Sequence, residues 1–100
     1  MSQEASPSHR FIVEAREHLA SMSSAMIALE RNQGDPQLVI EQLLRAAHSI
    51  KGGAGFIGRH NIERLAHAME EAIENVRDGS VPRNPEVVDT LLAVLHEIAA

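Results

Sequence analysis

One short stretch of the sequence brings together three residues that suit the handling of a charged group. His48 is followed three positions later by Lys51, the single lysine of the chain, and then directly by Gly52. On a helix, residues three and four apart share one surface, so an imidazole, an ammonium group and a bare patch of backbone would lie together. The spacing therefore indicates a site that binds a charged group.

Phosphoryl transfer is the chemistry that this combination suggests. A histidine that accepts a phosphoryl group must be neutral, exposed and held in the tautomer that frees one ring nitrogen as nucleophile. A carboxylate holds the proton of the other nitrogen best, because it orients the ring and stabilises the charge that develops on attack. Glu70 and His67 are the candidates that helix packing would bring beside His48. Lys51 would lean over the incoming phosphoryl group and offset its charge.

Three glycines follow the lysine, at positions 52, 53 and 55. Each glycine inside a helix costs about 1 kcal/mol relative to alanine, so an uninterrupted helix would lose roughly 3 kcal/mol here. Such a cost suggests a use, and we predict a docking surface at Gly52 and Gly53 that leaves the imidazole open to another protein. Gly53 and Gly55 would also let a neighbouring helix approach closely. The alternative that the helix simply ends at Gly52 stays open from the sequence.

Apolar residues recur at three-and-four spacing in four segments, which predicts four amphipathic helices. We expect the first to begin near Ser8, the second to be capped by Asp35 with Pro36 at its first position, and breaks at 32–36, 58–61 and 78–85. Gly34 is the expected cap at the end of the first helix. The predicted core stripes are Phe11, Ala15, Leu19, Met22, Met26 and Leu29; Val39 or Ile40, Leu43, Ala47, Ile50 and Ala54; Ile62, Leu65, Met69, Ile73 and Val76; and Val88, Leu91, Leu92, Leu95 and Ile98.

These helices and their short connections predict an all-α fold, an antiparallel up-down four-helix bundle. Residues 1–8 are polar and carry no apolar period, so we expect a flexible N-terminal leader, followed by one domain over residues 9–100. The last helix, from about Pro85, reaches Ala100 without a cap or linker. We therefore expect that the chain was cut from a longer protein.

The composition narrows the classes of partner and compartment. One hundred residues with a net charge of -5 and no dense Lys/Arg cluster argue against a nucleic-acid or anionic-membrane surface, and favour protein partners. The absence of cysteine fits a reducing compartment. The longest apolar run, residues 91–95, falls far short of the roughly 20 residues that a membrane span needs. We expect a cytoplasmic chain with no membrane association.

Two segments resemble a known family. Residues 45–58 read RAAHSIKGGAGFIG and residues 67–70 read HAME, a pattern similar to histidine phosphotransfer (Hpt) domains, above all the N-terminal phosphotransfer domain of chemotaxis-type histidine kinases. The similarity covers residues 9–100. It implies that His48 is the phosphorylated residue, that Glu70 accepts a hydrogen bond from its other ring nitrogen, and that Lys51 and His67 complete the network. It also implies that Gly52 leaves the docking surface open.

The resemblance further implies a phosphorelay carrier without a catalytic site of its own. A histidine kinase catalytic domain would donate the phosphoryl group and a response-regulator receiver aspartate would accept it. ATP and Mg²⁺ would belong to the kinase and Mg²⁺ to the receiver, so we expect no cofactor bound by this chain. The parent would be a larger chemotaxis-type sensor kinase, with a free-standing carrier as the alternative, and the isolated domain would be a monomer. Members of the family often have a fifth helix, which leaves the C-terminal boundary open.

Two other classes remain as alternatives. His48, His67 and Glu70 could meet around zinc in a metal-binding bundle, although the Glu-x-x-His pairs of carboxylate di-metal bundles do not occur in the sequence. A purely structural helical adaptor would explain the bundle but not the single lysine beside the glycines. The glycines at 53, 55 and 58 match a dinucleotide fingerprint by letter only, because that loop requires a preceding strand.

Overall fold

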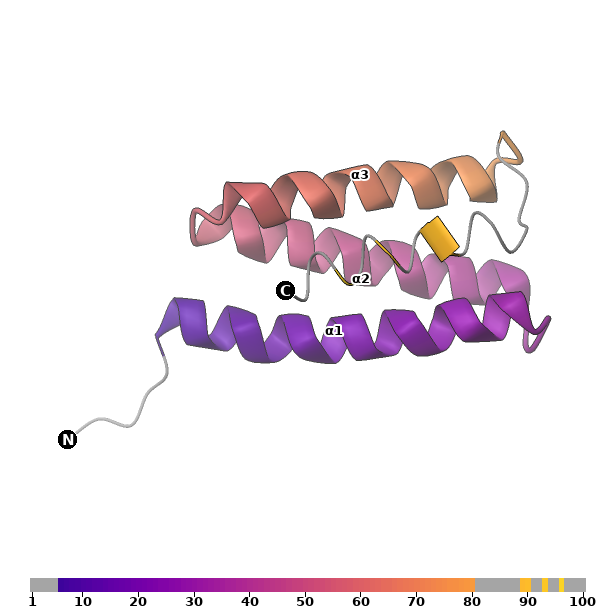
Figure 1. The fold of residues 1–100 in the computed structure, drawn as a ribbon, viewed down its shortest axis with the longest axis horizontal. Coiled ribbons are helices and arrows are strands. Elements are labelled where there is room, and N and C mark those ends of the chain that lie inside the picture. The colour runs from indigo at the N-terminus through magenta and orange to yellow at the C-terminus, as the bar shows by residue number, and fades with distance from the viewer. Residues whose placement is uncertain (1–5, 81–88, 91–92, 94–95, 97–100) are drawn as a thin grey trace.

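The structure, a computed structural model, describes residues 6–80 together with Asp89, Thr90, Ala93 and His96. Within these residues the chain forms three helices and no strand: α1 (Pro7–Glu30), α2 (Pro36–Phe56) and α3 (His60–Arg77). Consecutive helices run in opposite directions, and α2 packs against both of its neighbours (Figure 1). The predicted all-helical fold is confirmed to this extent.

A capping side chain precedes α1 and α2. The Ser6 hydroxyl accepts a hydrogen bond from the amide of His9 at 3.1 Å, and the Asp35 carboxylate accepts one from the amide of Gln37 at 2.9 Å. Each cap satisfies an amide that has no partner within the helix. The predicted start of α2 at Asp35 and Pro36 is confirmed, and α1 begins one residue before its predicted start. Residues 1–5 of the predicted leader lie outside the described residues.

The turns between the helices use left-handed backbone conformations. After α1, Asn32 has a φ of 54° and Gly34 a φ of 73°, so the first left-handed residue is Asn32 and not the predicted cap, Gly34. Asparagine tolerates this conformation because its short amide bonds locally. Gly58 has a φ of 79° between α2 and α3, which brings α3 back along α2.

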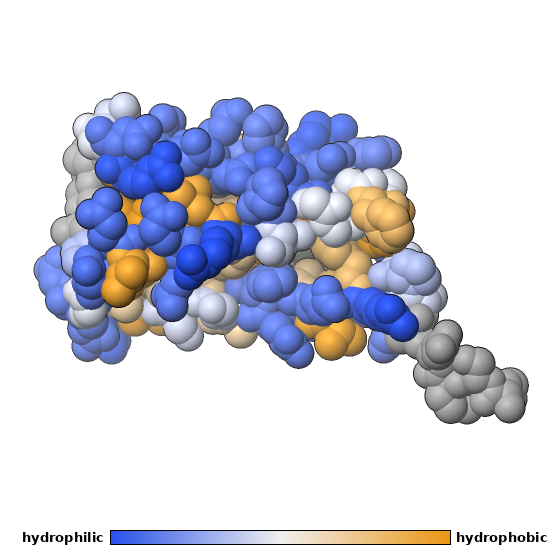
Figure 2. All heavy atoms as spheres, turned by 180° about the vertical axis from the view of Figure 1, so that it is seen from behind, coloured by the Kyte–Doolittle hydropathy of each residue, from blue (hydrophilic) through white to orange (hydrophobic). Residues whose placement is uncertain are grey.

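The core lies on both sides of α2. Its fully buried large side chains are Met22, Met26, Leu43, Ile50, Met69 and Ile73. The stripes predicted for the first three helices are confirmed, with four members only partly buried at the core edge: Phe11, Ile62, Leu65 and Val76. Seen from behind, the rows of side chains over α3 and α1 are largely hydrophilic, while apolar and near-neutral side chains gather between them (Figure 2).

The helix α2 continues through its glycines, so the alternative end at Gly52 is wrong. A Cβ at Gly53 would lie 2.8 Å from Phe11 Cδ1 on α1, and one at Gly55 would lie 2.6 Å from Glu63 Oε2 on α3. A Cβ at Gly52 would meet no atom within 4 Å. Two of the three glycines therefore permit close contacts with neighbouring helices, as predicted, and Gly52 faces open space.

The predicted fourth helix falls largely outside the described residues. Asp89, Thr90, Ala93 and His96 have helical backbone. Among the described residues, no helix combines the length and the apolar character that crossing a membrane requires.

The two neighbouring glycines should respond differently to the same substitution. Gly52→Ala should raise the free energy of unfolding by about 0.5–1 kcal/mol, because alanine favours the helix and meets open space. Gly53→Ala should not show this gain, because its methyl group must push the Phe11 ring aside. Urea unfolding measures both; equal stabilities would contradict the close approach of α1 at Gly53.

Candidate functional site

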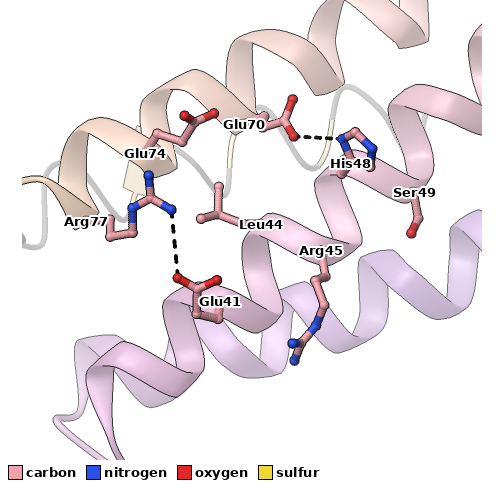
Figure 3. A pocket seen from close by; sticks show the side chains of 8 residues that line it. All are labelled: Glu41, Leu44, Arg45, His48, Ser49, Glu70, Glu74 and Arg77. Carbon is pink, nitrogen blue, oxygen red and sulfur yellow. Dashed lines mark hydrogen bonds and ion pairs between the residues drawn. The ribbon is translucent and has the colours of Figure 1, made fainter.

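His48 lies on the exposed side of α2, next to α3. Its side chain is 70% exposed, whereas the adjacent Ala47 and the following core residue Ile50 are buried. The ring turns its Nδ1 toward α3, where it lies 3.0 Å from Oε2 of Glu70 (Figure 3). One edge of the imidazole is therefore held by the protein while the rest of the ring faces solvent.

Glu70 is the residue that holds the ring. On α3 it follows Met69 and precedes Ile73 by three positions, and both of these are packed in the core, which keeps the carboxylate at the α2–α3 boundary. The Glu70 side chain is only 13% exposed. Its second oxygen, Oε1, accepts a hydrogen bond from the Lys51 ammonium at 2.5 Å. One carboxylate thus bridges the imidazole and the ammonium, one oxygen for each.

These contacts keep Glu70 ionised. The hydrogen bond from Lys51 is the main cause that lowers the pKa of the Glu70 carboxyl below its ordinary value of 4.5, and the hydrogen bond with His48 lowers that pKa further. Partial burial acts in the opposite direction but is outweighed. A carboxylate stabilised in its charged form accepts hydrogen bonds and donates none.

This charge state determines the tautomer of the imidazole. Because the Glu70 carboxylate only accepts, the hydrogen-bond network requires the proton on Nδ1 of His48. In the neutral ring, Nε2 then carries a free lone pair. The site can therefore present a neutral, exposed nitrogen nucleophile whose other nitrogen is fixed from behind.

The structure brings Lys51 to Glu70 and not over the exposed nitrogen. The Nζ atom of Lys51 forms an ion pair with Oε1 of Glu70, and the Lys51 side chain is 27% exposed. In this state the ammonium supports the carboxylate that orients the ring. The predicted contact of Lys51 with a phosphoryl group stays a prediction.

His67 belongs to a different contact. Its Nε2 lies 3.1 Å from Oε1 of Glu71, one helical turn later on α3, and both side chains are mostly exposed. No hydrogen bond or ion pair among the described residues joins His67 to His48, Lys51 or Glu70. In this structure an i,i+4 partner on its own helix engages His67, and its expected participation in the network around the phosphoryl group stays a prediction.

The zinc alternative depended on the same residue. Among the described residues, no group of three or more His, Cys, Asp and Glu side chains is placed to hold a metal ion. His48 contacts Glu70, but His67 forms its ion pair with Glu71.

The two glycines assigned to the docking surface also differ. Gly52 is exposed, one turn after His48, and no side chain stands beside it. Gly53 is turned about 100° further round the helix, where it is half-buried against Phe11. Gly52 is thus open to a partner, whereas Gly53 is half-buried against α1; the docking surface at these two glycines stays a prediction.

A shallow hollow of about 420 Å³ begins at the His48–Glu70 contact and follows the boundary between α2 and α3. It is lined by Glu41, Leu44, Arg45, His48, Ser49, Glu70, Glu74 and Arg77 (Figure 3). At its far end Arg77 Nη1 lies 3.8 Å from Glu41 Oε1, and neither residue was among the predicted site residues. No spacing rule joins residues on two different helices, so the sequence gives no signal for this pair.

The lowered pKa of Glu70 makes stability depend on pH in a defined direction. A carboxyl whose pKa is lower in the folded chain stabilises the fold above its unfolded pKa, and this contribution is lost as the pH falls through the folded pKa. The difference in unfolding free energy between wild type and Glu70→Gln should therefore be largest above the ordinary value of 4.5 and shrink in stronger acid. Urea unfolding across this range measures it, with Glu74→Gln as the control on the same helix; a difference independent of pH would contradict the coupling.

Comparisons with known proteins identify relatives of the chain. The sequence matches the Hpt domain family over residues 9–100. It is 32% identical to the chemotaxis protein CheA of Halobacterium salinarum over 97 residues, and 35% identical to that of Rhizobium meliloti over 82 residues. These alignments cover 90% and 82% of this chain but only 14% and 11% of the two relatives. The chain thus spans a small part of the curated relatives that it matches.

A solved structure is similar over nearly the same region. The phosphorylated P1 domain of CheA3 from R. sphaeroides, determined in complex with CheY6, superposes with a TM-score of 0.80 at 28% sequence identity. The match covers 91% of this chain and 70% of the CheA3 chain. With the family match over almost its whole length, the chain belongs to the Hpt domain family.

Proposed function

We propose that this chain is a phosphorelay carrier in which His48 accepts a phosphoryl group from a histidine kinase catalytic domain and passes it to a receiver aspartate. The observation that carries the proposal is the contact of Nδ1 with Glu70 in a ring that is 70% exposed. The solved neighbour, a phosphorylated domain in complex with CheY6, supports the same direction of transfer.

The proposed chemistry needs no proton to be transferred within the chain. Nε2 of His48 attacks the γ-phosphorus of the donor nucleotide, the Nε2–P bond forms, and the bond from phosphorus to the bridging oxygen breaks with release of ADP. The proton stays on Nδ1, where the Glu70 carboxylate stabilises the positive charge that develops on the ring. In the second step a receiver carboxylate attacks phosphorus, the Nε2–P bond breaks, and the neutral imidazole returns.

Glu70 and Lys51 are proposed as positioning residues for both steps. Glu70 holds the tautomer and the ring orientation, and Lys51 fixes Glu70 through its second oxygen. A nucleophile held in one orientation avoids part of the entropy cost of reaction. The ammonium also offsets the carboxylate charge, which otherwise would repel the incoming phosphate.

The proposal extends to the cofactors, the compartment and the parent protein of this chain. The donor nucleotide and Mg²⁺ belong to the partner proteins, and the chain itself binds no cofactor and has no catalytic site. It works in the cytoplasm as a monomeric domain of a larger chemotaxis-type kinase, or as a free-standing carrier. The periodic apolar residues of 88–98 support a fourth helix that completes an antiparallel bundle.

The phosphoacceptor assignment is tested by His48→Gln. This variant should incorporate no phosphoryl group from a chemotaxis-type kinase and radiolabelled ATP, while circular dichroism shows an unchanged fold because the side chain is exposed. The exposed His60→Gln variant serves as the matched control and should be labelled like wild type. Label retained by His48→Gln would contradict the assignment.

The positioning roles predict graded effects on rate. Glu70→Gln should slow phosphoryl transfer by roughly one to two orders of magnitude, since a misplaced reacting group can lose about 100-fold. Lys51→Met should slow it less, because it removes only the support of the carboxylate. Single-turnover kinetics measures the rates, with the Glu74→Gln variant as the control for loss of one charge on α3. Rates equal to wild type would remove both residues from the mechanism.

A further inference from the structure

Charge is unevenly distributed along the bundle, although the chain as a whole carries a net charge of -5. The helices α1 and α3 begin, and α2 ends, at the same end of the described structure (Figure 1). Three arginines at this end, Arg10, Arg59 and Arg64, are exposed, and none of them forms an ion pair among the described residues. We call these three arginines the basic end.

The carboxylates near the basic end do not cancel its charge. Within the first two turns of α1 and of α3 the acidic residues are Glu14 and Glu63, and Oε1 of Glu63 lies 3.0 Å from Nδ1 of His60. The backbone dipoles add positive potential, because two helices begin at this end and one ends there. Among the described residues, the opposite end is acidic, with Glu30, Asp35, Glu41, Glu74 and Asp78 beside Arg31 and Arg77. The electrostatic potential therefore changes sign along the bundle.

The basic end begins close to the reactive ring of His48. Arg64 precedes Glu70 by six residues on α3, which corresponds to about 9 Å along the helix axis. Because Glu70 contacts Nδ1 of His48, Arg64 lies about this far along the bundle from the ring. The Debye length is about 10 Å at an ionic strength of 0.1 M, so the charge of Arg64 is only partly screened there. The ring's other nitrogen, Nε2, points away from Glu70 (Figure 3) and is open to a partner.

A potential of this shape favours an acidic partner in one orientation. A receiver presents its acceptor aspartate, and the Mg²⁺ assigned to it above requires further oxygen ligands, which carboxylates supply. The acidic end of the bundle repels such a centre and the basic end attracts it. Complementary charges orient two proteins before they touch and raise the rate of productive encounter.

We propose that the basic end steers a receiver domain, so that its acidic acceptor centre arrives over Nε2 of His48 and not over the acidic end of the bundle. The inference rests on the proposed function. It concerns the approach of the receiver and requires no direct bond between an arginine and the receiver. Gly52, between His48 and the end of α2, presents no side chain in this path.

Steering matters more for the receiver than for the kinase domain. The matched relatives are many times longer than this chain, so a kinase domain in the same polypeptide would meet His48 at a high effective concentration. A receiver that diffuses freely must find the ring by a bimolecular encounter, and long-range attraction accelerates this step.

The test measures the two half-reactions separately and at two salt concentrations. Wild type, Arg64→Gln and Arg64→Glu are phosphorylated with a chemotaxis-type kinase and radiolabelled ATP, and transfer is then followed to a receiver that accepts phosphate from wild type. Arg31→Glu is the matched control, because Arg31 is an exposed arginine at the acidic end of the bundle. Melting temperatures verify that all variants fold.

The expected result is a loss in kcat/KM for the receiver that depends on salt. At about 0.05 M salt Arg64→Gln should lose about 2-fold and Arg64→Glu about 4-fold, because two unit charges about 10 Å apart in water change an equilibrium by a factor of about 2. At about 0.5 M salt, where the Debye length is about 4 Å, the losses should disappear. Labelling by the kinase and kcat at saturating receiver should stay at wild-type values, and Arg31→Glu should behave like wild type.

Each other outcome overturns a defined part of the account. A wild-type chain that takes no label overturns the proposed function itself. Normal labelling with transfer unchanged in Arg64→Glu overturns only the steering. An equal loss in Arg31→Glu shows an effect of net charge, a loss that persists at high salt shows a direct contact, and slower labelling with unchanged transfer assigns the basic end to the kinase; each of these overturns receiver steering.

Discussion

The site depends on one carboxylate that is shared between two helices. Glu70 projects from α3 and offers one oxygen to His48 and the other to Lys51, both on α2. Removing the carboxylate would release the imidazole and the ammonium together. Because Met69 and Ile73 hold the backbone beside Glu70 in the core, the position of the carboxylate is a consequence of how α2 and α3 pack. The same packing of α2 against α3 thus stabilises the fold and places the carboxylate that orients His48.

The glycines of α2 likewise serve both the packing of the helices and the surface beside His48. Gly53 lets α1 approach and Gly55 lets α3 approach, while Gly52 leaves the surface next to His48 bare. Each lowers the intrinsic helix propensity by about 1 kcal/mol, yet α2 runs through all three. The burial of Ile50 and Ala54 on the other side of the helix compensates for this weakness, because tertiary packing contributes more to helix stability than propensity does. The segment that carries His48 therefore has a low intrinsic helix propensity and is held helical by its packing in the core.

Much of this arrangement follows from the sequence, since periodicity reports the buried face of a helix directly. It correctly placed the core stripes of the first three helices and the exposed side of α2 that carries His48. The pairing of Glu70 with His48 required the resemblance as well, because spacing alone does not tell which of two helix faces meet. The pairing of His67 with Glu71 on the same helix was not predicted, because spacing does not tell which of several neighbours a histidine contacts. The orientation of Gly53 toward Phe11 depends on the separation of α1 and α2, a distance that no sequence pattern contains.

The central claim is that Glu70 holds the proton on Nδ1 of His48 and so leaves Nε2 as the nucleophile. NMR of the labelled imidazole nitrogens, recorded under alkaline conditions where the ring is neutral, reads the tautomer of His48 without any partner protein. We expect the Nδ1–H tautomer in wild type and a shift toward the Nε2–H tautomer in Glu70→Gln. A ring that carries its proton on Nε2 in the wild-type chain would contradict the account.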